Sequence, residues 1–357
     1  MPATNKILRL RPKTQVTHIP TLNFLSDNFQ ITYLCDMSLA HLCASPDVDV
    51  VLIASSDIYH VMHARLALQH NKFVFIETPM ALSLQEADCI IEAEKHSSGK
   101  VMVGYMRRYA SGFLDAVKEI GDIDQVQYAR VRDIVWSDAS STAFFAQSGT
   151  FSKVCFDRGE GFEREYRERT EGMFIQALED ELGIEYDLVV AVQWRYLGRR
   201  GSHDLSAMRE ALGMPVGVLG ASFCEAEGRQ FWSALFQYPS FAVSYESGVD
   251  EVPRFDVSIE VFGENKTVKV CFDSPYVKGL PTTMHIREKL EDVSFQESVV
   301  RKTYEDAYTL EMKELYAVVV EGKPVKTTAE DARKDIEIFG MIMKAGVEGQ
   351  ARLNRKV

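Results

Sequence analysis

Glycine is missing from the beginning of this chain. The first glycine is Gly99, although the 357 residues contain 22 glycines. A Gly-x-Gly-x-x-Gly turn allows a dinucleotide pyrophosphate to approach backbone N–H groups at a helix N-terminus, because any Cβ atom would obstruct that approach. The N-terminal part of the chain therefore has no such turn.

Clustered cysteines and long apolar runs are also missing. The six cysteines show no C-x-x-C spacing, which favours reduced thiols in the cytoplasm over disulfides or a structural metal site. No apolar run approaches the roughly 20 residues that cross a bilayer, so we expect no membrane segment. The N-terminal residues are basic without a following apolar stretch, which favours a frayed tail over a transit peptide and argues against a secretory signal.

Positive charge is scarce relative to negative charge. Lysine and arginine number 40 against 52 acidic residues, which gives a net charge of -12. Phosphate neutralisation requires clustered basic residues, so we expect a small-molecule partner and no nucleic acid. A hydrophobic content of 46% and a length of 357 residues are typical of a globular protein with two domains.

Three short apolar runs in the first part of the chain predict parallel strands buried on both faces. These runs are Val50–Ala54, Phe73–Ile76 and Lys100–Gly104. A helix is expected over Tyr59–His70, and a second helix should begin after a cap at Ser83 and end near Lys95. Strand, helix and strand within about thirty residues form a right-handed crossover unit. Phe29–Asp36 is expected to be a further strand that ends in an acid able to bind ribose hydroxyls.

The second part of the chain has longer alternating strands, typical of a half-exposed sheet. Thr328 is expected to cap a terminal helix that extends to Gly346. Arg158–Asp187 is charge-dense and favours a solvated helix or mobile loop over a binding site. The predicted strands are Val126–Val135, Phe231–Tyr238, Phe241–Tyr245, Phe255–Val261 and Thr267–Phe272, with a turn at Gly263–Lys266.

The segment Asp47–Arg108 resembles the glucose-fructose oxidoreductase, inositol dehydrogenase and MocA family. Its Glu77-Thr78-Pro79 triplet stands where the family has Glu-Lys-Pro, and Gly201-Ser202-His203 matches a Gly-x-His segment. The runs Gly201–Glu210 and Tyr245–Asp250 resemble a fungal-type branch.

The resemblance implies an α/β fold in two domains. Residues 1–108 would form an incomplete Rossmann-like doubly wound domain that lacks the glycine-rich turn and one helix-strand unit. Residues 109–357 would form an α+β substrate and oligomerisation domain with a large, mostly antiparallel open sheet, whose exposed face commonly supports dimers or tetramers in the family. We therefore expect a homodimer or homotetramer.

The resemblance also implies an NAD- or NADP-dependent oxidoreductase that acts on a hydroxyl or carbonyl of a sugar, polyol or pathway metabolite. His203 is the candidate acid/base, Thr78 replaces the motif lysine, and Asp204 is a candidate to orient the imidazole. The candidate cofactor-binding residues are Asp36, Ser55, Ser56, His60, Glu77 and Arg108. His60 and His63 lie three residues apart, but they lack the carboxylate of a His-Glu-x-x-His site, so no metal is expected.

Alternative interpretations accompany several of these assignments. Taken without the resemblance, His203 is compatible with a helix cap or a surface residue. Thr78 is also compatible with a tolerated residue before Pro79, and Arg108 with an interdomain salt bridge. The missing turn is explained by a shortened gene copy or gene model, or, less favoured, by phosphate binding through Arg9, Arg11 and Lys13. The alternative function is a catalytically inactive family member that acts as a ligand-binding or partner-stabilising subunit.

Overall fold

The computed structural model describes residues 14–34, 40–136, 159–224, 230–275, 277, 279–292 and 294–354. The chain divides into two compact units, each assembled from separate stretches of sequence. The first unit comprises residues 1–104, 146–186 and 312–336, and the second comprises residues 105–145, 187–311 and 337–357, so far as they are described.

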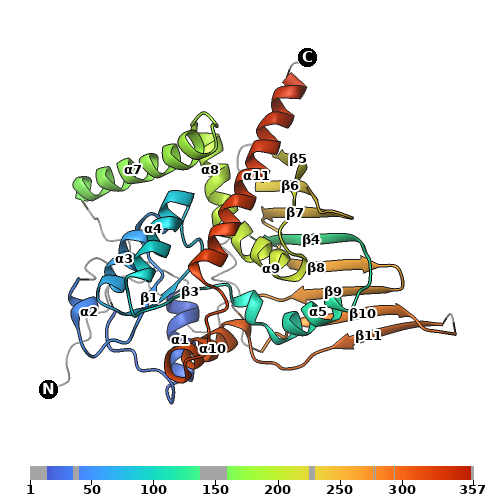
Figure 1. Ribbon diagram of the computed structural model, residues 1–357, viewed down its shortest axis with the longest axis horizontal. Helices are drawn as coiled ribbons and strands as arrows, with labels where there is room; N and C mark the ends of the chain where they lie inside the picture. The colour runs from blue at the N-terminus through green and yellow to red at the C-terminus, as the bar shows by residue number, and fades with distance from the viewer. Residues whose placement is uncertain are drawn as a thin grey trace. The chain divides into compact units, whose positions relative to one another are not determined.

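The first unit contains a parallel sheet in the order β1-β2-β3, with strands β1 (Val50–Ile53), β2 (Phe73–Ile76) and β3 (Val101–Val103). Its register pairs Val50 with Phe73 and Val74 with Val101. Helix α3 (His60–Gln69) connects β1 to β2, and α4 (Leu84–Lys95) connects β2 to β3 (Figure 1). The three strands and both helices predicted from apolar runs are confirmed.

Helix α4 begins where its cap predicts. The backbone N–H of Glu86 donates to Ser83 Oγ at 3.0 Å. This bond satisfies one of the amide groups that a helix N-terminus leaves without an intrahelical partner.

Several shorter elements complete the first unit. They are η1 (Thr14–His18), α1 (Ile19–Phe24), α2 (Ala40–Ala44), η2 (Asp57–Tyr59), α7 (Gly159–Ile175) and η4 (Gln176–Glu181). Two long helices, α10 (Ala307–Glu321) and α11 (Ala329–Asn354), contribute residues to both units. Thr328 Oγ1 accepts from the Asp331 amide at 3.1 Å, which confirms the predicted cap, but α11 continues beyond Gly346.

The strand predicted over Phe29–Asp36 is wrong for its described part. Residues 29–34 form no strand, and their side chains are half-buried or exposed rather than buried on two faces. Phe29 packs edge-on against Tyr316 of α10, and Tyr33 is 40% exposed. An apolar run forms a strand only where a neighbouring strand accepts its hydrogen bonds, and the described residues provide none beside it. Asp36 lies outside the described residues.

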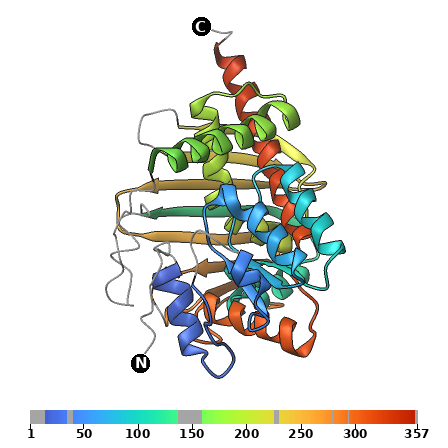
Figure 2. The same cartoon turned by 90° about the vertical axis from the view of Figure 1, so that its left-hand side faces the viewer.

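The second unit is built on an eight-stranded sheet in the order β11-β10-β9-β8-β4-β7-β6-β5. Its strands are β4 (Val126–Trp136), β5 (Gly217–Phe223), β6 (Gln230–Gln237), β7 (Ala242–Asp250), β8 (Phe255–Gly263), β9 (Lys266–Phe272), β10 (Thr283–Lys289) and β11 (Phe295–Val300). Figure 2 shows the green strand β4 between β7 and β8. The β4 and β7 pair is parallel, whereas the other pairs are antiparallel, so the predicted large and mostly antiparallel sheet is confirmed.

Helices pack on one face of this sheet. Helix α5 (Ser111–Gly121) contacts β9 and β10, and α9 (Ser202–Leu212) contacts β4. The remaining elements before α9 are η3 (Met106–Tyr109), α8 (Leu188–Tyr196) and η5 (Leu197–Gly201). In none of the described segments is a helix both long enough and apolar enough to traverse a bilayer.

Candidate active site

Glu77 lies at the carboxyl end of β2 and forms a buried pair with His18. The distance from His18 Nε2 to Glu77 Oε1 is 2.5 Å, and both side chains are almost fully excluded from solvent. The second carboxylate oxygen accepts from the Thr78 amide at 3.3 Å. His18, 59 residues earlier in the chain, thus holds the side chain of Glu77, the first residue of the Glu77-Thr78-Pro79 triplet. The sequence did not indicate this contact.

Ser55, Ser56 and His60 lie at the carboxyl end of β1. Ser55 Oγ is 2.9 Å from His63 Nδ1, and Ser56 Oγ donates to Asp57 Oδ1 at 3.0 Å. The two ring nitrogens of His60 face two carbonyl oxygens, that of Pro79 at 2.8 Å and that of Ser55 at 3.2 Å. A neutral imidazole carries one N–H and so donates to one of these oxygens, while its other nitrogen lies against the second. His60 thereby connects the ends of β1 and β2.

Side chains of α7 reach the same strand end. Tyr166 OH is 3.4 Å from Ser56 Oγ, and the Arg169 guanidinium lies 5.3 Å from the Tyr59 ring centroid. Tyr59 stacks on His63 with ring centroids 5.8 Å apart. Burial, followed by the charges of His60 and Arg169, lowers the pKa of His63 to about 4. Of the two structures expected for the Arg158–Asp187 segment, a solvated helix or a mobile loop, the helix is found over α7, and its side chains contact this strand end.

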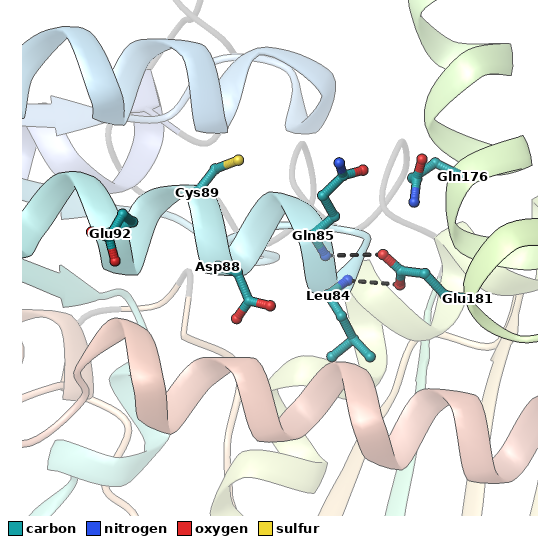
Figure 3. Close-up of a pocket in the computed structure, with 7 residues that line it drawn as sticks. All are labelled: Leu84, Gln85, Asp88, Cys89, Glu92, Gln176 and Glu181. Carbon is teal, nitrogen blue, oxygen red and sulfur yellow. Dashed lines mark hydrogen bonds between the residues drawn. The ribbon is translucent and has the colours of Figure 1, made fainter.

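A hollow of about 620 Å³ lies between α4 and η4 (Figure 3). The Glu181 carboxylate accepts from the Leu84 amide at 2.8 Å and the Gln85 amide at 2.9 Å, so a second segment also caps α4. Burial raises the pKa of Glu86, in the first turn of the helix, to about 7 despite the amide of Leu82, which donates to it. The hollow is lined by Leu84, Gln85, Asp88, Cys89, Glu92, Gln176 and Glu181.

The first unit fits one half of a dinucleotide better than the other. Hydroxyl groups and Glu77 at the ends of β1 and β2 suit hydrogen bonds to a ribose or carboxamide. A pyrophosphate needs a backbone cradle without a Cβ, and the glycines beside the sheet do not provide one: a Cβ at Gly99 would meet Lys72 O at 2.1 Å, and one at Gly104 would meet Phe75 Cζ at 3.1 Å. The described residues therefore do not fit the pyrophosphate.

The second unit contains a buried ion cluster centred on Arg107. Its Nη2 atom donates to Asp133 Oδ2 at 2.8 Å, and its Nη1 atom donates to Asp204 Oδ1. The aromatic rings of Phe255 and Phe272 lie 6.0 and 5.5 Å from the guanidinium carbon. Burial opposes the charge of Arg107, but the two carboxylates outweigh it and raise the pKa of Arg107 above its ordinary value.

His203 occupies the first turn of α9 and is half-buried. Asp204, the next residue and our candidate to orient its imidazole, accepts instead from Arg107. Arg108 donates to Glu210 of α9, and both residues belong to the second unit. The structure thus divides the candidate residues between the two units: Thr78, Glu77, Ser55, Ser56 and His60 belong to the first, and His203, Asp204 and also Arg108, which we expected in the first domain, belong to the second.

Sequence reasoning missed Arg107 and Asp133. The strand Val126–Trp136 alternates, and its buried positions include Ala129, Val131, Asp133 and Val135. A carboxylate within an apolar alternation is costly to bury without a partner. That single feature was available in the sequence and would have identified Asp133 as a site residue.

Comparison with known proteins bears on the first unit directly. Residues 13–105 match a family model described as an oxidoreductase family with an NAD-binding Rossmann fold. Residues 13–105 belong to the Gfo/Idh/MocA family. The match begins before β1 and includes β3, so it contains the whole three-stranded parallel sheet.

Curated Gfo/Idh/MocA relatives match the chain over a short stretch. Inositol 2-dehydrogenase of Salmonella typhimurium is 40% identical over 82 residues, which are 22% of this chain and 24% of the relative. A 1-carboxy-3-chloro-3,4-dihydroxycyclohexa-1,5-diene dehydrogenase of Comamonas testosteroni is 37% identical over 94 residues, which are 26% of this chain and 23% of the relative. The aligned stretch thus spans about a quarter of the curated relatives.

Solved structures show that the wider fold is the same. The yvaA protein of Bacillus subtilis superimposes with a TM-score of 0.67 at 14% identity, over 95% of each chain. Aldose-aldose oxidoreductase of Caulobacter crescentus superimposes with a TM-score of 0.60 at 18% identity, over 87% of this chain and 81% of that one. The large sheet is therefore also a shared element of this fold.

Proposed function

We propose that this chain is an NAD(P)-dependent oxidoreductase that transfers hydride to or from a hydroxyl or carbonyl carbon of a sugar, polyol or pathway metabolite. The observation that carries the proposal is the match of residues 13–105 to an NAD-binding oxidoreductase family. The names of the inositol, dihydroxycyclohexadiene and aldose relatives support a small hydroxylated substrate.

His203 is the residue to which we assign proton transfer. Oxidation of an alcohol needs a group that takes the hydroxyl proton within hydrogen-bond reach, and imidazole titrates near neutral pH. Its place in the first turn of α9, half-buried, supports this role. Thr78 bears no charge at neutral pH, so its contribution is limited to a hydrogen bond.

An inactive ligand-binding or partner-stabilising role is the second candidate. It is favoured by the absence of glycine before Gly99 and by Thr78 in place of lysine. It is also favoured by the first unit itself, where the polar side chains of Ser55 and Glu77 already bond to His63 and His18. A protein of this kind would retain its fold and lose its affinity for dinucleotide.

Isothermal titration calorimetry with NADH and NADPH separates the two candidates. The three tryptophans, Trp136, Trp194 and Trp232, all belong to the second unit, so a direct heat measurement reports the first unit better than intrinsic fluorescence does. We expect one of the two dinucleotides to bind and Ser56→Ala to weaken it, with Ser98→Ala, an exposed position in the same unit, as the unaffected control. No heat from either dinucleotide at millimolar concentration would contradict the enzymatic proposal.

We also infer a cytoplasmic homodimer or homotetramer, with a small molecule and neither nucleic acid nor membrane as its partner. Exposed side chains on the large sheet support self-association, among them Tyr128 and Leu235 at 37% and 39% exposure. Sedimentation velocity checks the oligomeric state, and a monomer at micromolar concentration would contradict it.

A further inference from the structure

Two carboxylates in the second unit bind the same guanidinium group, that of Arg107. Asp133 lies on β4 and Asp204 on α9, and each binds a different terminal nitrogen of Arg107. All three side chains are at most 7% exposed. Two buried negative charges against one positive charge leave an excess that a low-dielectric interior does not tolerate.

Hydrogen bonds from neighbouring polar atoms do not offset this excess of negative charge. Asp133 Oδ1 and Asp204 Oδ2 are buried and make no hydrogen bond of regular geometry to the described residues. Buried polar oxygens are normally hydrogen-bonded. We therefore expect a hydrogen atom between these two oxygens or beside each of them. A carboxylate has only acceptors, whereas a protonated carboxyl has an O–H to donate.

Three hydroxyl groups surround the same place. The sheet register sets Ser247 beside Asp133 and Tyr245 beside Val131, and a Cβ at Gly201, just before α9, would lie 3.5 Å from Tyr245 OH. The hydroxyl oxygens of Tyr196, Tyr245 and Ser247 are buried and, like the two carboxylate oxygens, make no regular hydrogen bond to the described residues. The cluster therefore contains five buried oxygens, of which the three hydroxyl oxygens each carry one hydrogen and the two carboxylate oxygens carry none unless a proton is bound.

We propose that Asp133 and Asp204 share one proton and so form a buried acid on the helix-covered face of the large sheet. Asp204 carries the proton in its resting state and Asp133 remains ionised as the partner of Arg107. The shared proton bridges the two carboxyl groups and leaves the cluster with no net charge. The site lies one residue along α9 from His203, but the proposal stands whether or not the chain transfers hydride.

The directions of the pKa shifts agree with a proton on Asp204 and an ionised Asp133. Burial and then the charge of Asp133 raise the pKa of Asp204 well above its ordinary value. Burial opposes the charge of Asp133, but the attraction of Arg107, the hydrogen bond from Asp204 and the charge of Arg200 together lower the pKa of Asp133. Other charged or titratable groups interact with the pair or with Arg107, namely Arg200 on η5, Tyr196 on α8, Tyr245 on β7 and Tyr308 on α10. His203 precedes Asp204 on α9.

Infrared difference spectroscopy at neutral pH tests the proposal. A protonated carboxyl has a carbonyl stretch distinct from that of a carboxylate, and we expect Asp204→Asn to remove one such band. Glu86 also holds a proton near neutral pH, so each protein is prepared in a Glu86→Gln background. Asp124→Asn, at an exposed position of the same unit, is the control that should leave the band unchanged. A band that persists in Asp204→Asn would overturn the proposal.

Thermal unfolding gives a second reading. Asparagine resembles a protonated aspartate, so Asp204→Asn should change the Tm little, whereas Asp133→Asn removes the ionised partner of Arg107 and should lower the Tm by on the order of 10 °C. Equal losses in the two variants would show two ionised carboxylates, with Arg200 supplying the second positive charge, and would also overturn the proposal. If the Asp133→Asn variant does not fold, this result agrees with the expected loss of stability. The infrared measurement on Asp204→Asn is then the deciding test.

Discussion

Neutralising Glu86 should stabilise the protein in alkaline solution and not in acid. Glu86 lies in the first turn of α4, where burial raises its pKa from 4.5 to about 7. Between these two pH values the folded chain binds more protons than the unfolded chain, so stability falls as the pH rises through this window. In the Glu86→Gln variant the amide side chain would carry no charge and would still accept from the Leu82 amide, which now donates to Glu86 at 3.3 Å.

The size of this change in stability follows from the pKa shift of Glu86. Each pKa unit corresponds to ~1.4 kcal/mol, so the rise from 4.5 to about 7 sets an upper limit of about 3.5 kcal/mol. Since Glu86 is half-buried and water screens part of the penalty, we expect roughly 1–2 kcal/mol, or about 3–6 °C in Tm. Glu86→Gln should therefore match the parent near pH 5 and exceed it near pH 8.

Differential scanning calorimetry of both proteins at the two pH values measures this difference. Glu163→Gln, at an exposed position on α7, is the matched control and should show the same small effect at each pH. A gain in Tm of equal size at pH 5 and pH 8 would refute the electrostatic reasoning, because it would show that packing rather than charge is responsible.

Three further predictions concern individual side chains. Replacing Thr78 with lysine should raise turnover on any substrate found, and an unchanged rate in a steady-state assay would argue against a role for this position. His203→Gln should lower kcat by roughly 10²–10⁴-fold at unchanged folded content, measured by single-turnover kinetics. His63 should stay neutral down to about pH 4, so an NMR titration of its ring should show no midpoint near 6.5. Because the ring in the unfolded chain binds a proton at a higher pH than in the folded chain, the free energy of unfolding should decrease as the pH falls from 6.5 towards 4.

Local sequence patterns predicted most of the fold. The cap at Ser83, the apolar runs of β1 and β2 and the turn after β8 depend on residues close together in the chain, so their structures followed from propensity and periodicity. The pattern failed for residues 29–34, where apolar residues without a neighbouring strand remain irregular. A strand requires a partner, and no local signal reports whether one exists.

The candidate site was only partly predictable. The sequence selected His203, Glu77 and Thr78 because they stand in recognisable motifs. It could not reveal that His18 pairs with Glu77 or that Arg107 reaches Asp204, because these pairs are separated by 59 and 97 residues. Their meeting depends on how helices and strands pack, which no short window of sequence encodes.

By itself the sequence determined the absence of a glycine-rich turn, the parallel strands and the family of residues 13–105. Tertiary structure alone decided the ionic states of the buried groups. Asp133 and Asp204 are ordinary carboxylates in a list of residues, and they become a proton-sharing pair only when a sheet and a helix exclude water and offer both the same guanidinium. Chemical character of this kind arises from burial and neighbouring charge, and both are properties of the folded chain.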